Sequence, residues 1–297
     1  MTPSTSLPDW LRRLYPFQPQ SFVTPHGAHM SFLDEGPPGD EAVLMLHGNP
    51  TWSFYFRDLV HALAPRLRCI VPDHVGMGLS DKPQDYDYRL ATRIDDIAAL
   101  VAHLGLRRVH LVVHDWGGAI GFGVAARQPE LIGRLVILNT AAFASPWIPR
   151  RIALCRTSFP GTLLVRGANG FAWPATRMAM HQRKLTTDEK RAYLLPYDSW
   201  ANRVAVDAFV KDIPLEESHP SMETLHVIEA ALPKFGDRPA LIAWGGRDFC
   251  FDHRFLACWR EVFPQAQVEP YAEAGHYVLE DAGLDIRRRI SEFFNRE

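Results

Sequence analysis

Short apolar runs typical of buried strands alternate along the chain with longer segments in which apolar residues recur at helical spacing. The strand-like runs are Ala42–Leu46, Cys69–Val71, Val109–Val113, Leu135–Leu138, Ala240–Ala243 and Gln267–Tyr271. From Ile94 to Leu104 the apolar positions follow one helix face, and Gly105 comes next as a stop signal. Segments near Phe22 and at His29–Leu33 predict a starting hairpin. This alternation predicts an α/β protein with a mostly parallel sheet and helices on both faces.

The alternation stops between Ala141 and Leu215. This stretch contains short helical pieces and no clear strand, and six prolines punctuate it: Pro146, Pro149, Pro160, Pro174, Pro196 and Pro214. We interpret it as a helical cap inserted into the sheet domain. The predicted organisation is therefore a first part of the core at 1–140, the cap at 141–215 and a second part of the core at 216–297. Large apolar side chains of the cap can pack on each other and also face a ligand, because ligands of open α/β sheets bind at the carboxyl ends of the strands.

Charge and composition narrow the class of partner. The 297 residues include 32 Lys and Arg against 34 Asp and Glu, which gives a formal net charge of −2. This near-neutral charge predicts neither a basic surface for nucleic acid nor a polybasic segment that binds membranes. With 47% apolar residues the chain can form a sizeable core. We therefore expect a small or apolar molecule as the ligand.

The cysteines and the N-terminus both favour a reducing compartment. The four cysteines form no CxxC pair and no cluster at metal-ligand spacing: Cys69, Cys155, Cys250 and Cys258. We expect free thiols and no metal. Residues 1–9 lack the order of a signal peptide, and no apolar run approaches the ~18 residues of a membrane span, so we expect a cytoplasmic protein. The apolar turn from Trp10 to Tyr15 is expected to pack on its own domain rather than on a membrane or a partner.

The strand Val109–Val113 runs through His114, Asp115, Trp116 and two glycines into a helical segment ending at Arg127. This pattern is typical of a nucleophile elbow, a tight strand-to-helix turn that exposes one side chain. The central residue is Asp115, where a serine hydrolase has Ser. An Asp here could also cap the following helix, but a cap would not explain the partner residues described next.

An acid and a histidine follow the elbow in the chain order of α/β-hydrolases. Asp248 comes after the Ala240–Ala243 run, and His276 comes after the last run. A carboxylate nucleophile forms a covalent ester, and a histidine oriented by a buried acid can act as general base. We therefore predict Asp115, His276 and Asp248 as catalytic residues. Asp252 is a weaker choice for the acid because it lies nearer the following helix, and Asn139 at the end of another strand is neutral.

Two neutral donors complete the predicted site. Asn49 lies in the loop after Ala42–Leu46, where this type of fold builds its oxyanion hole, and Trp116 follows the nucleophile directly. The indole N–H can only donate, so the pair suits a soft anion or a developing carboxylate. The alternative, purely structural roles are stabilisation of the loop by Asn49 and packing of Trp116 in the core. We expect His114 to be structural rather than catalytic.

These motifs resemble the haloalkane dehalogenase branch of the α/β-hydrolase superfamily. The resemblance runs from about Phe22 onward and is carried by the segments 47–52, 72–83 and 114–118. It implies that Asp115 is the nucleophile, His276 the base and Asp248 the supporting acid, with Asn49 and Trp116 holding a halide. Epoxide hydrolases and fluoroacetate dehalogenases fit less well, because they typically have other residues at the positions of Asn49 and Trp116 respectively.

The cap and the C-terminal part look more similar still to the cis-β-lactone decarboxylases of bacterial long-chain olefin biosynthesis. The segments that carry this likeness are 137–143, 165–171, 196–203, 209–214, 248–251 and 275–281. The resemblance implies decarboxylation of a long-chain cis-β-lactone to a cis-alkene, with no cofactor and with the upstream β-lactone synthetase as a partner. Asp115 would attack either the ring carbon that bears the lactone oxygen or the carbonyl carbon. The alternatives are a hydrolytic haloalkane dehalogenase and a non-catalytic binding module.

Overall fold

The core of the protein is an eight-stranded, mostly parallel sheet. The computed structural model describes residues 7–295, so most of the polar stretch at residues 1–9 lies outside the described residues. The strands are β1 (Gln20–Val23), β2 (His29–Glu35), β3 (Glu41–Leu46), β4 (Cys69–Pro72), β5 (Arg108–Asp115), β6 (Ile132–Thr140), β7 (Ala240–Gly245) and β8 (Gln267–Tyr271). Their order is β1-β2-β4-β3-β5-β6-β7-β8. Antiparallel pairing is confined to β1 with β2 and β2 with β4, which confirms the predicted hairpin and parallel sheet.

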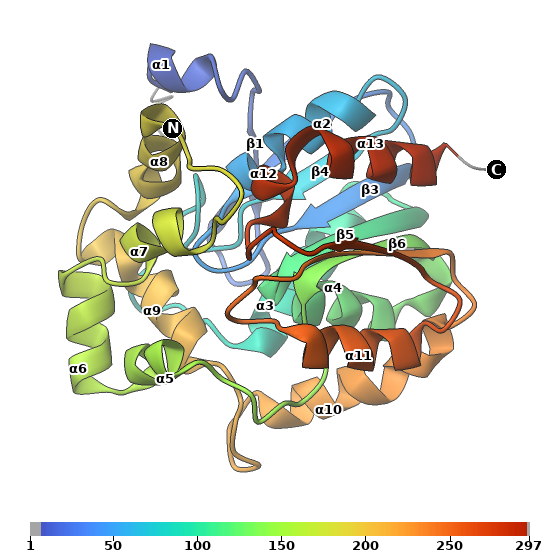
Figure 1. The fold of residues 1–297 in the computed structure, drawn as a ribbon. Coiled ribbons are helices and arrows are strands. Elements are labelled where there is room, and N and C mark those ends of the chain that lie inside the picture. Colours follow the sequence, from blue (N-terminus) through green and yellow to red (C-terminus); the bar gives the residue numbers. More distant parts are fainter. Residues whose placement is uncertain (1–6, 296–297) are drawn as a thin grey trace.

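Helices cover both faces of this sheet (Figure 1). The core helices are α1 (Asp9–Arg12), α2 (Arg57–Leu63), α3 (Leu90–His103), α4 (Trp116–Arg127), α10 (Met222–Ala231), α11 (His253–Val262), α12 (Val278–Asp281) and α13 (Gly283–Phe294). Helices α3, α4, α10 and α11 lie on one face, and α2, α12 and α13 lie on the other. Short 3-10 and π turns complete the chain: η1 (Ser53–Phe56), η2 (Pro129–Leu131), η3 (Leu163–Gly167), η4 (Leu195–Tyr197), η5 (Ala201–Arg203) and η6 (Leu232–Phe235).

The predicted helix before β5 illustrates how the pattern becomes packing. In α3, Ile94, Ile97 and Val101 are buried against the sheet, as the helical spacing of apolar residues requires. The chain leaves the helix through Gly105, whose φ is +63°, a left-handed conformation that glycine adopts without steric cost. The sequence therefore predicts this helix and its end correctly.

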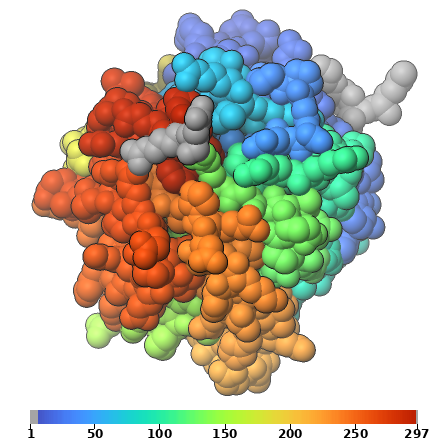
Figure 2. Space-filling model, turned by 90° about the vertical axis from the view of Figure 1, so that its right-hand side faces the viewer, coloured from blue at the N-terminus to red at the C-terminus, as the bar shows by residue number. Residues whose placement is uncertain are grey.

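Residues 141–215, which the sequence predicts as a cap, are helical and contain no strand. They form α5 (Arg150–Arg156), α6 (Phe159–Thr162), α7 (Ala172–Met178), α8 (Thr187–Leu194) and α9 (Val204–Lys211). Figure 1 places these helices at one end of the sheet, beyond the carboxyl ends of the parallel strands. Figure 2 views a side of the molecule on which core segments before residue 140 and after residue 216 form nearly the whole surface. Any site between the cap and the sheet lies at the other end.

Ionic and hydrogen-bonding contacts fasten the cap to the core at α12. The carboxylate of Glu280 binds Arg57 of α2 and Arg183 of the cap, and it accepts a hydrogen bond of 2.6 Å from the Tyr193 hydroxyl. The neighbouring Asp281 accepts hydrogen bonds from main-chain N–H groups of the cap, among them that of Gln182. Glu280 is 3% exposed, so these charges attract each other in a region with little screening by water.

The N-terminal turn packs on its own chain, as predicted. Leu11 and Tyr15 are buried, and Arg191 of α8 stacks on the Trp10 ring at 4.1 Å from its centroid. All four cysteines are free, which confirms the expected thiols. Among residues 7–295, no helix is both long enough and apolar enough to cross a bilayer. No group of three or more His, Cys, Asp or Glu in this part of the chain has the arrangement of a metal site.

Candidate active site

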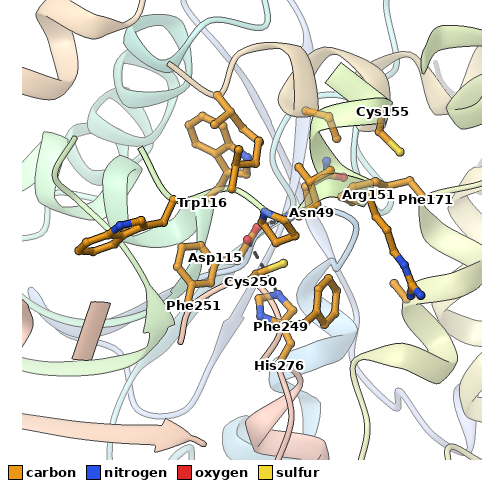
Figure 3. A pocket seen from close by; sticks show the side chains of 18 of the residues that line it. Asn49, Asp115, Trp116, Arg151, Cys155, Phe171, Phe249, Cys250, Phe251 and His276 are labelled. Carbon is orange, nitrogen blue, oxygen red and sulfur yellow. Dashed lines mark hydrogen bonds and ion pairs between the residues drawn. The ribbon is translucent and has the colours of Figure 1, made fainter. Parts of the chain in front are cut away.

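Asp115 occupies a sharp turn between β5 and α4. Its φ of +52° and ψ of −124° are unusual for a residue other than glycine, and such strain persists only where the surroundings enforce it. The Thr140 hydroxyl, on the neighbouring strand β6, donates a hydrogen bond to the main-chain carbonyl of Asp115. The Asp115 side chain makes no capping hydrogen bond to α4, so the alternative of a simple helix cap is wrong. Instead, the carboxylate points into a cavity (Figure 3).

Glycines allow the neighbouring backbone to approach this turn. A Cβ atom on Gly48 would lie 1.9 Å from Oδ1 of Asp115, and a Cβ atom on Gly117 would lie 2.0 Å from the carbonyl oxygen of Leu46. Both distances are far below van der Waals contact, so no other residue fits without displacing the backbone. The loop after β3 and the start of α4 are therefore packed directly around the nucleophile position.

The three predicted catalytic residues come together at the carboxyl ends of β5, β7 and β8. His276 Nδ1 lies 2.8 Å from Oδ2 of Asp248, and His276 Nε2 lies 3.9 Å from Oδ2 of Asp115. The side chains of Asp248 and His276 are buried, with Asp248 fully enclosed, and the side chain of Asp115 is 12% exposed. The carboxylate of Asp248 thus orients the imidazole so that its other nitrogen faces Asp115, the geometry of a nucleophile, base and acid.

Burial and mutual charge set the protonation of this group. Burial raises the pKa of Asp115, against the opposing effects of His276 and of the N–H groups of Asn49 and Trp116. Burial by itself would lower the pKa of His276, but the charges of Asp248 and Asp115 and the hydrogen bond to Asp248 outweigh it and raise the pKa. The histidine therefore holds a proton more readily than free imidazole while it lies between two carboxylates.

Asn49 and Trp116 line the same cavity as Asp115. The main-chain N–H of Asn49 donates a hydrogen bond of 2.6 Å to Oδ1 of Asp115, so the backbone of Asn49 holds this carboxylate. The side-chain amide of Asn49 donates to the carbonyl of Val206 at 3.0 Å, which leaves its second hydrogen for a ligand. Together with the Trp116 indole this arrangement can bind an anion beside Asp115.

The cavity lies between the cap and the sheet and has a volume of about 360 Å³. Its walls come from α5, α7, the loops around them and the segment after β7, and nearly all of its side chains are apolar. The larger ones are Phe143, Trp147, Ile148, Ile152, Leu164, Phe171, Met178, Phe249, Phe251 and Phe255. The cap side chains thus face a ligand space as well as each other, and the space suits an apolar substrate with one reactive polar group.

The segment after Asp248 encloses the base. The Phe251 ring lies parallel to the His276 ring with centroids 5.8 Å apart, and the Phe249 ring lies on another side of the imidazole. The main-chain N–H of Cys250 donates a hydrogen bond of 2.6 Å to the free oxygen of Asp248. The two phenylalanine rings therefore flank the imidazole, a placement that the sequence reasoning did not assign to them.

The alternative residues have structural partners. Asp252 caps α11 by accepting a hydrogen bond from the Arg254 N–H, and Asn139 joins β6 to β7 through both main-chain groups of Gly245. His114 is fully buried, and its Nε2 lies 2.9 Å from the carbonyl oxygen of His276, so it supports the loop of the base. These contacts agree with the choice of Asp248 as the acid and with a structural role for His114.

One charged residue near the site escaped the sequence reasoning. Arg93 lies on the buried face of α3, three residues after Leu90 and one before Ile94, and its guanidinium stacks against Trp116. The available signal was a cation at a position where helical spacing requires an apolar residue. Such a position predicts a buried charge with a specific partner.

Comparison with known proteins agrees with this geometry. A family model of the alpha/beta hydrolase fold matches residues 41–283. The chain belongs to this family. Among solved structures, the haloalkane dehalogenase DbeA from Bradyrhizobium elkani superposes with a TM-score of 0.85 at 27% identity, covering 93% of this chain and 97% of that one. The predicted fold class is confirmed.

More similar relatives place the chain within the family. It is 47% identical over 289 residues to a cis-3-alkyl-4-alkyloxetan-2-one decarboxylase of Shewanella oneidensis, covering 95% of this chain and 90% of that protein. It is also 47% identical over 293 residues to the decarboxylase of the same name from Xanthomonas campestris pv. campestris, covering 95% and 97%. The predicted resemblance to these decarboxylases is therefore confirmed.

Proposed function

We propose that this α/β-hydrolase decarboxylates cis-3-alkyl-4-alkyloxetan-2-ones, which are β-lactones, to cis-alkenes and carbon dioxide. The observation that carries the proposal is the 47% identity, over nearly the whole chain, to two decarboxylases of that name. An apolar cavity with one carboxylate at its base supports it, because the substrate has two alkyl substituents on a small polar ring. Such a ligand buries its chains against the walls and presents its ring to Asp115.

In the proposed reaction an oxygen of Asp115 attacks the ring carbon that bears the lactone oxygen. The ring C–O bond breaks with inversion, and its electrons remain on the carboxylate that is released. The bond to that carboxylate then breaks, its electrons form the alkene, and the ester bond to Asp115 breaks in an anti elimination that frees the aspartate. Inversion followed by anti elimination amounts to syn loss, so a cis-lactone gives a cis-alkene. Attack at the carbonyl carbon, through an acyl anhydride, is the alternative route.

We assign the remaining roles from the contacts around the nucleophile. Asn49 holds Asp115 through its main-chain N–H, and its side-chain amide and the Trp116 indole donate hydrogen bonds to the developing carboxylate. His276, oriented by Asp248, stabilises charge next to Asp115, since decarboxylation needs no activated water. The mostly apolar walls of the cavity fit this water-free cycle, because a water molecule activated by His276 would hydrolyse the ester instead.

A haloalkane dehalogenase is the second candidate function. Its supporting observation is the superposition on DbeA, together with an Asp, His and Asp arrangement that could hydrolyse an alkyl ester. In that reaction Asp115 displaces halide, Asn49 and Trp116 bind it, and His276 activates water. The identity to the dehalogenase structure is 27%, against 47% for the decarboxylases, and this difference favours the first proposal.

A paired assay separates the two functions. Purified protein receives a cis-3,4-dialkyl-β-lactone in one vessel and a short bromoalkane in another, and the Asp115→Ala variant is run beside each. We expect alkene from the lactone, little bromide release, and no turnover of either substrate by the variant, because the nucleophile is gone. Rapid bromide release with intact lactone would instead establish a dehalogenase, and activity in the variant would contradict both proposals.

Labelled water tests the covalent cycle itself. During turnover of the lactone in water enriched in oxygen-18, Asp115 should remain unlabelled, because neither route of decarboxylation uses water. The bromoalkane reaction of a dehalogenase would transfer the label into Asp115. Accumulation of label during lactone turnover would show that the ester is hydrolysed and would contradict the decarboxylase mechanism.

The resemblance also suggests a partner and a location for the enzyme. We propose that the upstream β-lactone synthetase of olefin biosynthesis supplies the substrate by direct contact, and that the protein works in the cytoplasm. Free thiols at all four cysteines support a reducing compartment. Co-purification of the synthetase with the tagged chain from its native cells would test the contact.

A further inference from the structure

Behind the proposed anion site lies a buried positive charge. Arg93 of α3 is 2% exposed and does not line the cavity, whereas Trp116 does. The guanidinium carbon lies 4.2 Å from the centroid of the Trp116 ring and 3.9 Å from that of Phe209 on α9. At these distances a cation interacts strongly with the electrons of both rings, especially where water is excluded.

The cation is held in place by a carboxylate from the cap. Asp212 forms an ion pair with Arg93, and its Oδ1 accepts a hydrogen bond of 2.6 Å from the Ser221 hydroxyl. Arg89 lies 3.4 Å from the same carboxylate. Burial lowers the pKa of Arg93 to about 10, although Asp212 and Asp115 oppose the shift, so the group keeps its charge at neutral pH.

This arrangement is costly for stability alone. Within the described residues, Nη1 of Arg93 is buried without a hydrogen-bond partner, and a buried ion pair often stabilises a fold less than apolar side chains of similar size. A functional reason for keeping this buried ion pair exists if the charge of Arg93 acts on the proposed anion site. A cation over an indole face withdraws electron density from the ring, and this strengthens the N–H as a hydrogen-bond donor to an anion.

We propose that Arg93 is a positioning residue that fixes the Trp116 ring and strengthens its N–H donation to the anion bound beside Asp115. For the carboxylate released from a lactone, this inference rests on the proposed function. For a simple anion such as bromide it does not, because any anion in that position would meet the same indole. Asp212 contributes by holding Arg93, which ties the strength of the anion site to the cap.

The test measures bromide binding, with no substrate present, by quenching of tryptophan fluorescence. Trp116→Phe identifies the part of the quenching that belongs to the site. We expect Arg93→Met to raise the Kd for bromide about tenfold and Arg93→Lys to raise it about threefold, since lysine keeps the charge but not the planar stacking. With a lactone substrate, kcat of Arg93→Lys should fall more than KM changes.

Arg57 provides a matched control. It is 3% exposed, stacks on the Phe54 ring at 4.0 Å and pairs with Glu280, but it does not line or approach the cavity. Arg57→Lys should lower stability as Arg93→Lys does and leave the Kd for bromide unchanged. A shift of equal size in both variants would mean that general loosening of the fold weakens binding, and the proposal would be wrong.

Two further outcomes keep this test separate from the proposed function. If Arg93→Met does not fold, Arg93→Lys decides alone, and an unchanged Kd for bromide in that variant overturns the proposal. If the wild-type protein releases no alkene from lactones but shows the expected order of bromide affinities, the proposed function fails while the role of Arg93 stands.

Discussion

Asp115 combines a strained backbone with a buried charge. Its positive φ places the carboxylate above the turn, and the absence of a side chain at Gly48 leaves room for it. Strain of this kind costs about 1–3 kcal/mol, and the hydrogen bonds of Thr140 and Asn49 to this residue help to maintain it. The residue proposed as the nucleophile therefore also strains the backbone of the fold.

Replacing Asp115 by glycine should relieve that strain. We expect Asp115→Gly to be more stable than Asp115→Ala by about 1 kcal/mol, because glycine adopts the observed φ freely and this gain exceeds its greater entropy in the unfolded chain. Urea unfolding of the two inactive variants measures the difference. Both lose the same carboxylate, so the comparison isolates the backbone. A less stable glycine variant would show that the turn is not strained.

A buried histidine, His47, helps to hold the loop after β3. In the loop after β3, His47 Nδ1 lies 2.8 Å from the carbonyl oxygen of Gly48, and Nε2 accepts a hydrogen bond of 3.1 Å from the His74 N–H. One nitrogen must donate and the other must accept, so only the neutral ring fits. Burial accordingly lowers the pKa of His47 to about 4.

This histidine should make stability depend on pH. Between pH 6.5 and about 4 the unfolded chain binds a proton at His47 that the folded chain does not. The contribution of neutral His47 to the free energy of unfolding is therefore fully present above pH 6.5 and is lost as the pH falls through this window. The loss attributable to His47 is about 3 kcal/mol. Urea unfolding at pH 7 and pH 4.5 should show a smaller difference for His47→Gln than for the wild type. Parallel losses in both proteins would contradict this assignment.

Local pattern predicts the elements and the first residues after them, and this explains which parts of the site were foreseen. Asp115, Asp248 and His276 each follow a recognisable strand, and parallel strands deliver their carboxyl ends to one edge. The contact of Arg93 with Trp116 joins α3 to the elbow, and its carboxylate partner Asp212 comes from the cap. No local pattern specifies contacts between such distant segments, so the sequence indicates a buried charge at Arg93 but not the residues that it contacts.

The same limit applies to the way the nucleophile is held. The sequence predicts that Asn49 offers a side-chain amide donor in addition to its main-chain N–H, and in the structure the main-chain N–H makes the short contact to Asp115. Which of the two groups faces the carboxylate depends on the path of the loop after β3. That path is set by tertiary packing around Gly48, which residue types alone do not specify.

Across the whole molecule, a small set of buried carboxylates joins the cap to the core. Glu280 binds Arg57 and Arg183, and Asp212 binds Arg93 at another edge of the cap. Removing one partner of a buried ion pair leaves the other charge without compensation. These buried charges add to the hydrogen bonds and apolar packing between cap and core, and removing one partner of such a pair should have a large effect.

Glu280→Gln should test the attachment at α12. We expect the free energy of unfolding to fall by about 3 kcal/mol, because Arg57 stays buried without its shortest carboxylate contact and keeps only the longer ones to Glu189 and Asp58. Glu216→Gln is the control, since Glu216 pairs with Arg156 at the exposed surface and its loss should change little. Equal effects of the two variants, measured by urea unfolding, would contradict a dominant role for the buried pair.

Because α12 directly follows the His276 loop, the attachment of the cap at α12 also affects the position of that loop. Asp281 accepts hydrogen bonds from the N–H groups of Gly275 and His181 with the same oxygen, and the Tyr277 N–H donates to the carbonyl of Ala179 in the cap. Lifting this edge of the cap therefore pulls on the loop that aligns the imidazole. Correct placement of the imidazole thus depends on how the cap is seated at Ala179 and His181.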